Sequence, residues 1–164
     1  MQPEKYFFDD DGNIPNNKLP LLLYRDALNK GASGLMDHFR QHSWSNAWKN
    51  GVFSYHHYHS NAHEVLGVYS GTARLQLGGE NGKIVDVAFG DVIIIPAGVG
   101  HKNLQSSADF GVVGAYPNGS GYDLKTGKPG ERPQADKNIA EVPIPETDPV
   151  VGKNGGLVEI WNEI

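Results

Sequence analysis

The sequence predicts an all-β protein, and three observations support this expectation. Twenty-one glycines and ten prolines divide the 164 residues into short segments, as in small sheet proteins whose turns use these residues. Most segments between Gly51 and Tyr116 are rich in β-branched and aromatic residues, which favour strands. The connections between these segments are short, so neighbouring strands are expected to be antiparallel. The length suits a single domain, 1–164, with an N-terminal arm and helix (1–50), a sheet core (51–116) and a C-terminal arm (117–164).

One short helix is expected before the sheet core. Ser33 can cap a helix from about Gly34 to His42, in which Leu35 and Phe39 recur at helical spacing. The apolar face of this helix should pack against the sheet.

Seven strand segments follow, in the order VFSYHHYH, EVLGVYS, TARLQLGG, KIVDVAF, DVIIIPA, HKNLQ and DFGVVGAY. The stretch from Gly78 to Gly82 predicts a hairpin loop, because glycine and asparagine adopt the positive φ values of a tight reversal. The segment from Val92 to Ile95 is apolar on both faces. A partner subunit or the chain's own ends must therefore cover the outside of the sheet.

The C-terminal arm is rich in proline, glycine and charge, yet it finishes on the apolar stretch LVEIW. A disordered tail has little reason to finish in this way. We therefore expect an ordered arm whose last strand, near Leu157 to Trp161, returns to the sheet.

The composition excludes several classes of function. Without cysteine there is no disulfide, thiolate zinc site or cysteine nucleophile, so histidine, aspartate or glutamate must hold any metal. The net charge of −5 and the lack of a basic block argue against nucleic acid as a partner. No signal-peptide pattern and no long apolar run is present, so a cytoplasmic protein that does not enter the membrane is expected.

The stretch HHYHSNAHEV, residues 56–65, contains four of the seven histidines. Side chains alternate along a strand, so His57 and His59 share one face while His56 points to the other. His56 and His63 are expected to be surface or packing residues.

A carboxylate is expected beside these histidines. If a strand begins near His63, alternation places Glu64 on the core face together with Leu66 and Val68. A buried carboxylate beside unpaired imidazoles is costly, and a divalent cation would accept lone pairs from all of them. The pattern therefore favours a metal site.

The spacing resembles that of a known family. One stretch resembles the first motif of the cupin superfamily without a mismatch: Gly51, five residues, His57-Tyr58-His59, four residues, Glu64, six residues and Gly71. The second motif is similar to Gly90, five residues, Pro96-Ala97-Gly98, two residues and His101, with Gln105 where the family has asparagine. The chain looks like the small single-domain bacterial cupins of unassigned activity.

This resemblance implies a double-stranded β-helix, or jelly-roll barrel, with His57, His59, Glu64 and His101 converging on one metal ion. Three imidazoles and a carboxylate suit one divalent transition metal, whether Fe, Mn, Ni, Zn or Cu. A homodimer is also implied. Among the aromatic residues Trp44, Trp48, Tyr55 and Tyr69, which could line a pocket, most are expected at a subunit interface.

The expected function is that of a metal-dependent enzyme, oxygenase-like, acting on a small polar molecule. Glu64 is the candidate catalytic base as well as a ligand. Two alternatives stay open: a metal-dependent sugar isomerase or epimerase, and a non-catalytic cupin that binds a small molecule.

Metal binding is expected to depend on pH. Ligand histidines must be neutral, so the metal should be lost as the pH falls well below the ordinary histidine pKa of about 6.5. Dialysis against a chelator, followed by elemental analysis, measures this loss. Full retention at about pH 4.5 would contradict a histidine site.

Overall fold

The computed structural model describes residues 1–164 and consists mainly of strands, so the all-β prediction is confirmed. The elements in chain order are β1 Glu4–Tyr6, β2 Leu21–Tyr24, α1 Ala32–Gln41, β3 Trp44–Asn50, β4 Glu64–Ser70, β5 Thr72–Leu77, β6 Lys83–Ala88, β7 Val92–Ile95, β8 His101–Ser106, β9 Gly111–Pro117, α2 Gln134–Glu141 and α3 Gly156–Asn162.

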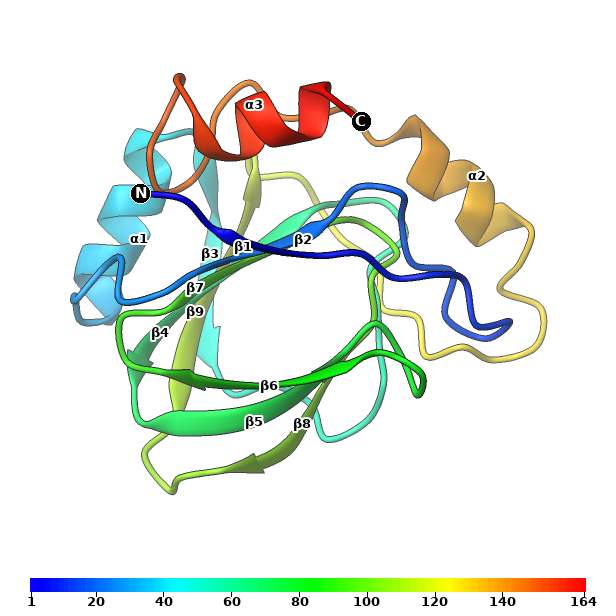
Figure 1. Ribbon diagram of the computed structural model, residues 1–164, viewed down its shortest axis with the longest axis horizontal. Helices are drawn as coiled ribbons and strands as arrows, with labels where there is room; N and C mark the ends of the chain where they lie inside the picture. The colour runs from blue at the N-terminus through cyan, green and yellow to red at the C-terminus, as the bar shows by residue number, and fades with distance from the viewer.

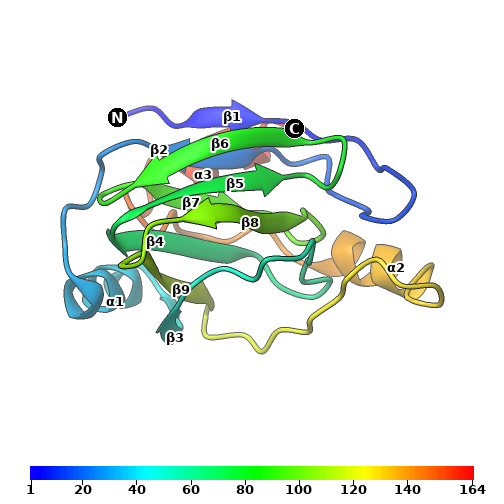
Figure 2. The same cartoon turned by 90° about the horizontal axis from the view of Figure 1, so that it is seen from below.

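The strands form two antiparallel sheets that face each other, as in a jelly roll (Figures 1 and 2). The larger sheet has the order β1-β2-β7-β4-β9-β3 and the smaller one the order β6-β5-β8. Many neighbours in space are far apart in sequence, such as β2 and β7. The hairpin predicted from Gly78 to Gly82 connects β5 to β6 and is confirmed, with φ of 85° at Gly78 and 87° at Gly79.

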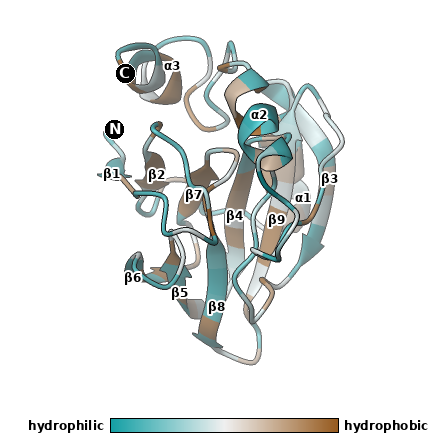
Figure 3. Cartoon of the chain, turned by 90° about the vertical axis from the view of Figure 1, so that its right-hand side faces the viewer, coloured by the Kyte–Doolittle hydropathy of each residue, from teal (hydrophilic) through white to brown (hydrophobic).

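The apolar faces of β7 divide the core into two layers. Ile93 and Ile95 face inward, toward the small sheet, whereas Val92 and Ile94 belong to an outer cluster. Helices α1 and α3 contribute to this outer cluster, so the chain itself covers the outside of the sheet. Figure 3 shows the apolar colour on β2, β7, β4 and β9, between α3 and the small sheet.

Helix α1 packs against the large sheet, as predicted, through Leu35 and Phe39, which are fully buried. Gly67 of β4 permits this contact, because a Cβ atom there would lie 2.9 Å from the ring of Phe39. The predicted cap is wrong, since the helix begins at Ala32 and Ser33 lies inside it.

The prediction of a final strand near Leu157 to Trp161 is wrong, because this stretch forms helix α3. Leu157 and Trp161 are four residues apart and therefore share one helix face, and both are fully buried in the outer cluster. The indole Nε1 of Trp161 donates to the carbonyl of Pro20 at 2.9 Å, which fixes the helix over β2.

Asp148 fastens the C-terminal arm to the large sheet. Its fully buried carboxylate accepts hydrogen bonds from the Tyr24 hydroxyl at 2.7 Å and from three backbone amides, those of Val150, Val151 and Leu157, at 2.6–3.0 Å. Four donors from β2, the arm and the start of α3 thus converge on one side chain.

The sequence analysis missed four elements: β1, β2, β3 and α2. It also extended a strand through VFSYHHYH, where residues 51–63 are irregular and only the isolated bridges at His57 and Tyr58 are sheet-like.

Strand β3 contains a bulge, with φ of 59° at Asn46 and a register shift between Ser45 and Trp48. The extra residue reverses the alternation of the strand. Trp44 therefore lies in the outer core, while Trp48 packs beside the inner core. Trp44 is 0% exposed within this chain, so it belongs to the core rather than to an interface.

None of the helices has both the length and the apolar character needed to cross a membrane.

Candidate metal centre

A cavity of about 450 Å³ lies between β8 and the β4, β9 and β3 side of the large sheet. All four predicted ligands line it: His57, His59, Glu64 and His101. Its other lining residues include the aromatic side chains of Trp48, Phe53, Tyr116 and Tyr122.

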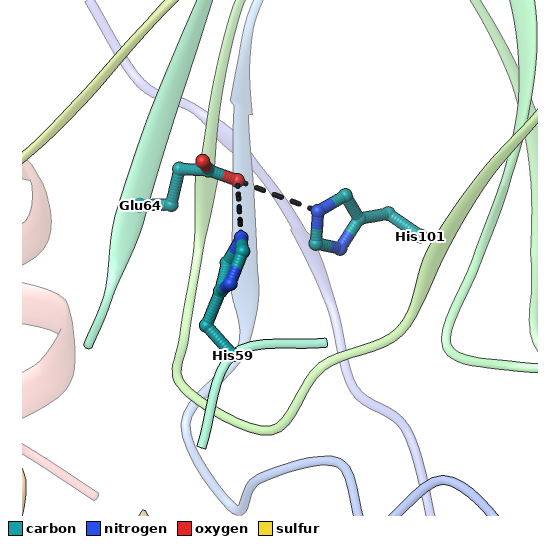
Figure 4. Close-up of side chains that lie close together, drawn as sticks. All are labelled: His59, Glu64 and His101. Atoms are coloured by element: carbon teal, nitrogen blue, oxygen red, sulfur yellow. Dashed lines mark ion pairs between the residues drawn. The ribbon is translucent and has the colours of Figure 1, made fainter. Parts of the chain in front are cut away.

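Glu64 lies at the first position of β4 and is 2% exposed. Alternation along this strand places it on the inner face with Leu66 and Val68, as predicted. Its Oε1 lies 3.5 Å from Nε2 of His59 and 3.4 Å from Nε2 of His101. Figure 4 shows both imidazoles directed at this one oxygen.

The three cavity histidines are oriented in the same way. Nδ1 of His57 lies 3.0 Å from the Tyr55 carbonyl, Nδ1 of His101 lies 3.2 Å from the Val99 carbonyl, and Nδ1 of His59 contacts the Asp123 carbonyl. A carbonyl only accepts hydrogen bonds, so each Nδ1 must carry the proton. The lone pair of each neutral ring is then on Nε2, the atom a metal would bind.

The charges of the centre require a proton or a metal ion between the donor atoms. Two Nε2 lone pairs and a carboxylate oxygen repel one another unless a proton or a metal ion lies among them. Burial alone would raise the pKa of Glu64, but His59 and His101 hold it below its usual range. Burial alone would lower the pKa of His59, but Glu64 raises it. The donor atoms of His59, Glu64 and His101 lie within 4.8 Å of one another, so this triad can hold a metal ion.

His57 lies beside this triad but outside it. Its ring centroid is 4.0 Å from that of His101 and 6.2 Å from that of His59. Burial, followed by the electrostatic effect of the neighbouring His101, lowers the pKa of His57 to about 3, so the His57 ring is neutral near pH 7. Its role as a fourth ligand stays a prediction.

The C-terminal arm holds the irregular histidine segment in place. Tyr58 and Lys125 exchange two backbone hydrogen bonds of 2.9 Å. The Asp123 carboxylate accepts the Ser60 amide at 2.6 Å and also contacts the Ser60 hydroxyl, while its carbonyl contacts His59. The position of the histidines thus depends on residues more than 60 positions away, and no sequence signal indicated this.

A second group of residues fixes the far side of the carboxylate. The Tyr116 hydroxyl donates to Oε2 of Glu64 at 2.7 Å, and the indole Nε1 of Trp48 donates to the Tyr116 oxygen at 2.7 Å. Oε1 alone then faces the histidines. The sequence analysis missed Tyr116, although alternation from Val112 along β9 places it on the inner face.

Replacing Tyr116 by phenylalanine should weaken metal binding about 10- to 100-fold, the usual effect of removing a hydrogen bond that orients a ligand. The measurement is the metal dissociation constant, obtained by competition with a chelator. Tyr69→Phe, on β4, is the matched control. An unchanged affinity in Tyr116→Phe would show that the hydroxyl does not position Glu64.

His56 and His63 lie outside the centre, as predicted. His56 hydrogen-bonds to Glu80 at 2.7 Å. His63 packs against Trp161, with ring centroids 4.8 Å apart, and its Nδ1 accepts the Ala97 amide at 2.9 Å.

His63 should make the stability depend on pH. Burial lowers its pKa to about 4, and protonation of Nδ1 would also break the bond from Ala97. Between about pH 6.5 and pH 4 the unfolded chain binds this proton and the folded chain does not. The free energy of unfolding therefore decreases by about 3 kcal/mol as the pH is lowered through this range. Above pH 6.5 this contribution is complete. Urea unfolding at about pH 8 and pH 4 should show that the free energy of unfolding changes less with pH in His63→Gln than in the wild type. An equal change in the two proteins would contradict the assignment of this pH dependence to His63.

Two sequence comparisons now bear on the family. A sequence model described as a cupin domain matches residues 43–108, which include all four predicted ligands. The chain is also 51% identical over 162 residues to the uncharacterized protein YjlB of Bacillus subtilis (strain 168), covering 98% of this chain and 97% of that protein. The chain belongs to the cupin superfamily. The resemblance inferred from the two motifs is thereby confirmed.

Solved structures similar to this cupin include two of different kinds. One is acireductone dioxygenase from Bacillus anthracis with a cadmium ion in its active centre, 16% identical over 58% of this chain and 77% of that chain, with a TM-score of 0.42. Another is procruciferin, an 11S globulin from Brassica napus, 23% identical over 49% of this chain, with a TM-score of 0.40. This cupin spans about a fifth of the globulin's length. Both scores are below 0.5, and the family assignment rests on the sequence matches.

Proposed function

We propose that this cupin is a metal-dependent enzyme of the oxygenase type that acts on a small molecule. The observation that carries the proposal is the common orientation of His57, His59 and His101. Every Nδ1 is held by a backbone carbonyl, which leaves Nε2 as the atom that a metal would bind. Backbone carbonyls that fix imidazoles in this way are the usual support of a metal site.

The donor set fits a divalent transition metal. His59, Glu64 and His101 would hold it, with His57 as the proposed fourth ligand, and iron or manganese would suit oxygen chemistry. When bound, such a metal supplies Lewis acidity and electron transfer to a substrate in the cavity.

The residues of the chain have distinct tasks in this proposal. Tyr116 and Trp48 hold Glu64 in one orientation. Glu64 is also the proposed base, and its position beside the cavity brings its carboxylate within reach of a substrate proton. The buried walls keep bulk water away from this end, which strengthens every charge interaction there.

Oxygen consumption tests the proposal directly. Protein prepared without a histidine tag is loaded with Fe(II) or Mn(II) and supplied in turn with diketones, phenols and thiols. We expect turnover with at least one class and its loss in His101→Ala. The matched control is His56→Ala, which removes a histidine of the same segment outside the centre.

Two results would oppose the proposal. Activity unchanged in His101→Ala would remove the metal from the mechanism. Stoichiometric metal without turnover of any substrate would instead favour the non-catalytic binding cupin.

A further inference from the structure

The cavity has polar groups at its two ends and apolar walls between them. The histidines and Glu64 occupy the buried end, while Lys49 and Asn50 are exposed at the mouth. Val52, Leu66 and Leu124 are among the apolar lining residues, together with four aromatic side chains already named. A ligand in the middle of the cavity would meet mainly carbon atoms.

The polar atoms of the buried aromatic wall are already engaged. The single donor of the Trp48 indole is used by the Tyr116 oxygen. The single donor of Tyr116 is used by Glu64. This wall has no free donor for a ligand hydroxyl, and a buried hydroxyl without a partner costs binding free energy.

Exposed aromatic rings extend this apolar surface to the mouth. Phe53 is 49% exposed and Tyr122 is 44% exposed. The Phe53 ring lies 5.1 Å from that of His57, and the Tyr122 ring lies 5.1 Å from that of His59. Neighbouring exposed apolar side chains at the mouth of a cavity are typical of a binding site.

Each of these two rings stacks on a second aromatic ring. Tyr122 stacks on Tyr116 with centroids 4.2 Å apart and planes 17° apart, and Phe53 stacks on Tyr55 with centroids 5.0 Å apart and planes 13° apart. Pre-ordered ring faces favour a flat ligand, because little side-chain freedom is lost when it binds.

We infer that the cavity takes a planar, largely apolar molecule, such as an aromatic compound, with its oxygen donors at the histidine end. The inference rests on the proposed metal site and names the substrate class. It disfavours the polyhydroxylated ring of a sugar, because hydroxyls in the middle of the cavity would lie unpaired against the apolar walls. The sugar isomerase alternative is thereby disfavoured.

The test measures binding and needs no turnover. The protein is loaded with Zn(II), freed of excess metal and titrated with 4-nitrocatechol, and binding is followed by the absorbance of the ligand and the quenching of protein fluorescence. Glucose is the polar comparison ligand. We expect 4-nitrocatechol to bind at least about 100-fold more tightly than glucose, since two or more sugar hydroxyls would remain unpaired.

Two variants locate the bound ring. Phe53→Ala and Tyr122→Ala should each weaken 4-nitrocatechol binding about tenfold, through lost stacking and buried area. Zinc content, measured by elemental analysis, should stay the same. Phe89→Ala is the matched control, because Phe89 is 45% exposed but does not line the cavity.

The inference is overturned if glucose binds as tightly as 4-nitrocatechol, or if the two variants bind it like wild type. A third result would also overturn the inference: Phe53→Ala or Tyr122→Ala changes a dimer into a monomer in sedimentation but keeps the wild-type ligand affinity. The two aromatic rings would then form an interface between copies of the chain. Failure of the metal proposal is visible separately, as absence of zinc in the wild type. Quenching by 4-nitrocatechol in the metal-free protein, reduced in Tyr122→Ala, would then still support the apolar cavity.

Discussion

Alanine at His59, Glu64 or His101 is expected to lower transition-metal affinity by more than about 100-fold, beyond the 10- to 100-fold effect of losing a supporting hydrogen bond. Each change removes one of three donor atoms that lie within 4.8 Å of one another. It also leaves the remaining buried donors unbalanced in charge. Elemental analysis of untagged protein gives the metal content, and chelator competition gives the affinity.

His56→Ala provides the matched control, since it removes an imidazole from the same segment but contacts Glu80 rather than the centre. His57→Ala decides the number of ligands. We expect it to lose metal as well, because its Nδ1 is held like the others. Wild-type affinity in His57→Ala would establish a three-ligand centre, and full metal content in Glu64→Ala would refute the site itself.

Asp148→Ala should lower the free energy of unfolding by about 3–5 kcal/mol, because four donors, most of them buried, lose their common acceptor at once. For a chain of this size the midpoint of thermal unfolding should fall by about 10 °C. Tyr24→Phe removes only one of the four bonds and should cost about 1–2 kcal/mol.

Asp37→Ala serves as the control, since this aspartate pairs with Arg40 on the exposed surface of α1 and should change stability by less than about 0.5 kcal/mol. Urea unfolding followed by circular dichroism measures all three variants. If Asp148→Ala cost no more than Asp37→Ala, the carboxylate would not be what fastens the arm.

Most of the site could be predicted because strand alternation places Glu64 and motif spacing places the histidines, although His57 and His59 lie in an irregular segment and not on a strand. Glu64 had to face inward once Leu66 and Val68 did. The supporting partners were harder to predict. Asp123 reaches His59 through a backbone carbonyl, and backbone groups leave no mark in a sequence.

The fold could be predicted where the strands are long and regular. It could not be predicted where the type of an element depends on a short apolar run. LVEIW is too short for its periodicity to separate a strand from a helix. Its burial as part of helix α3 follows from contacts with distant residues such as Pro20. The bulge in β3 likewise reverses the faces of Trp44 and Trp48. The one local signal was Asn46, a residue type that tolerates positive φ.

The carbonyls that orient the three imidazoles have a consequence for how this protein can evolve. Positions 55, 99 and 123 supply those acceptors through the peptide unit, which every amino acid carries. The acceptor role alone therefore places no demand on their side chains, although the Asp123 carboxylate separately holds Ser60. An insertion or deletion beside them would shift the peptide itself, so selection around the centre should preserve loop length as well as Asp123.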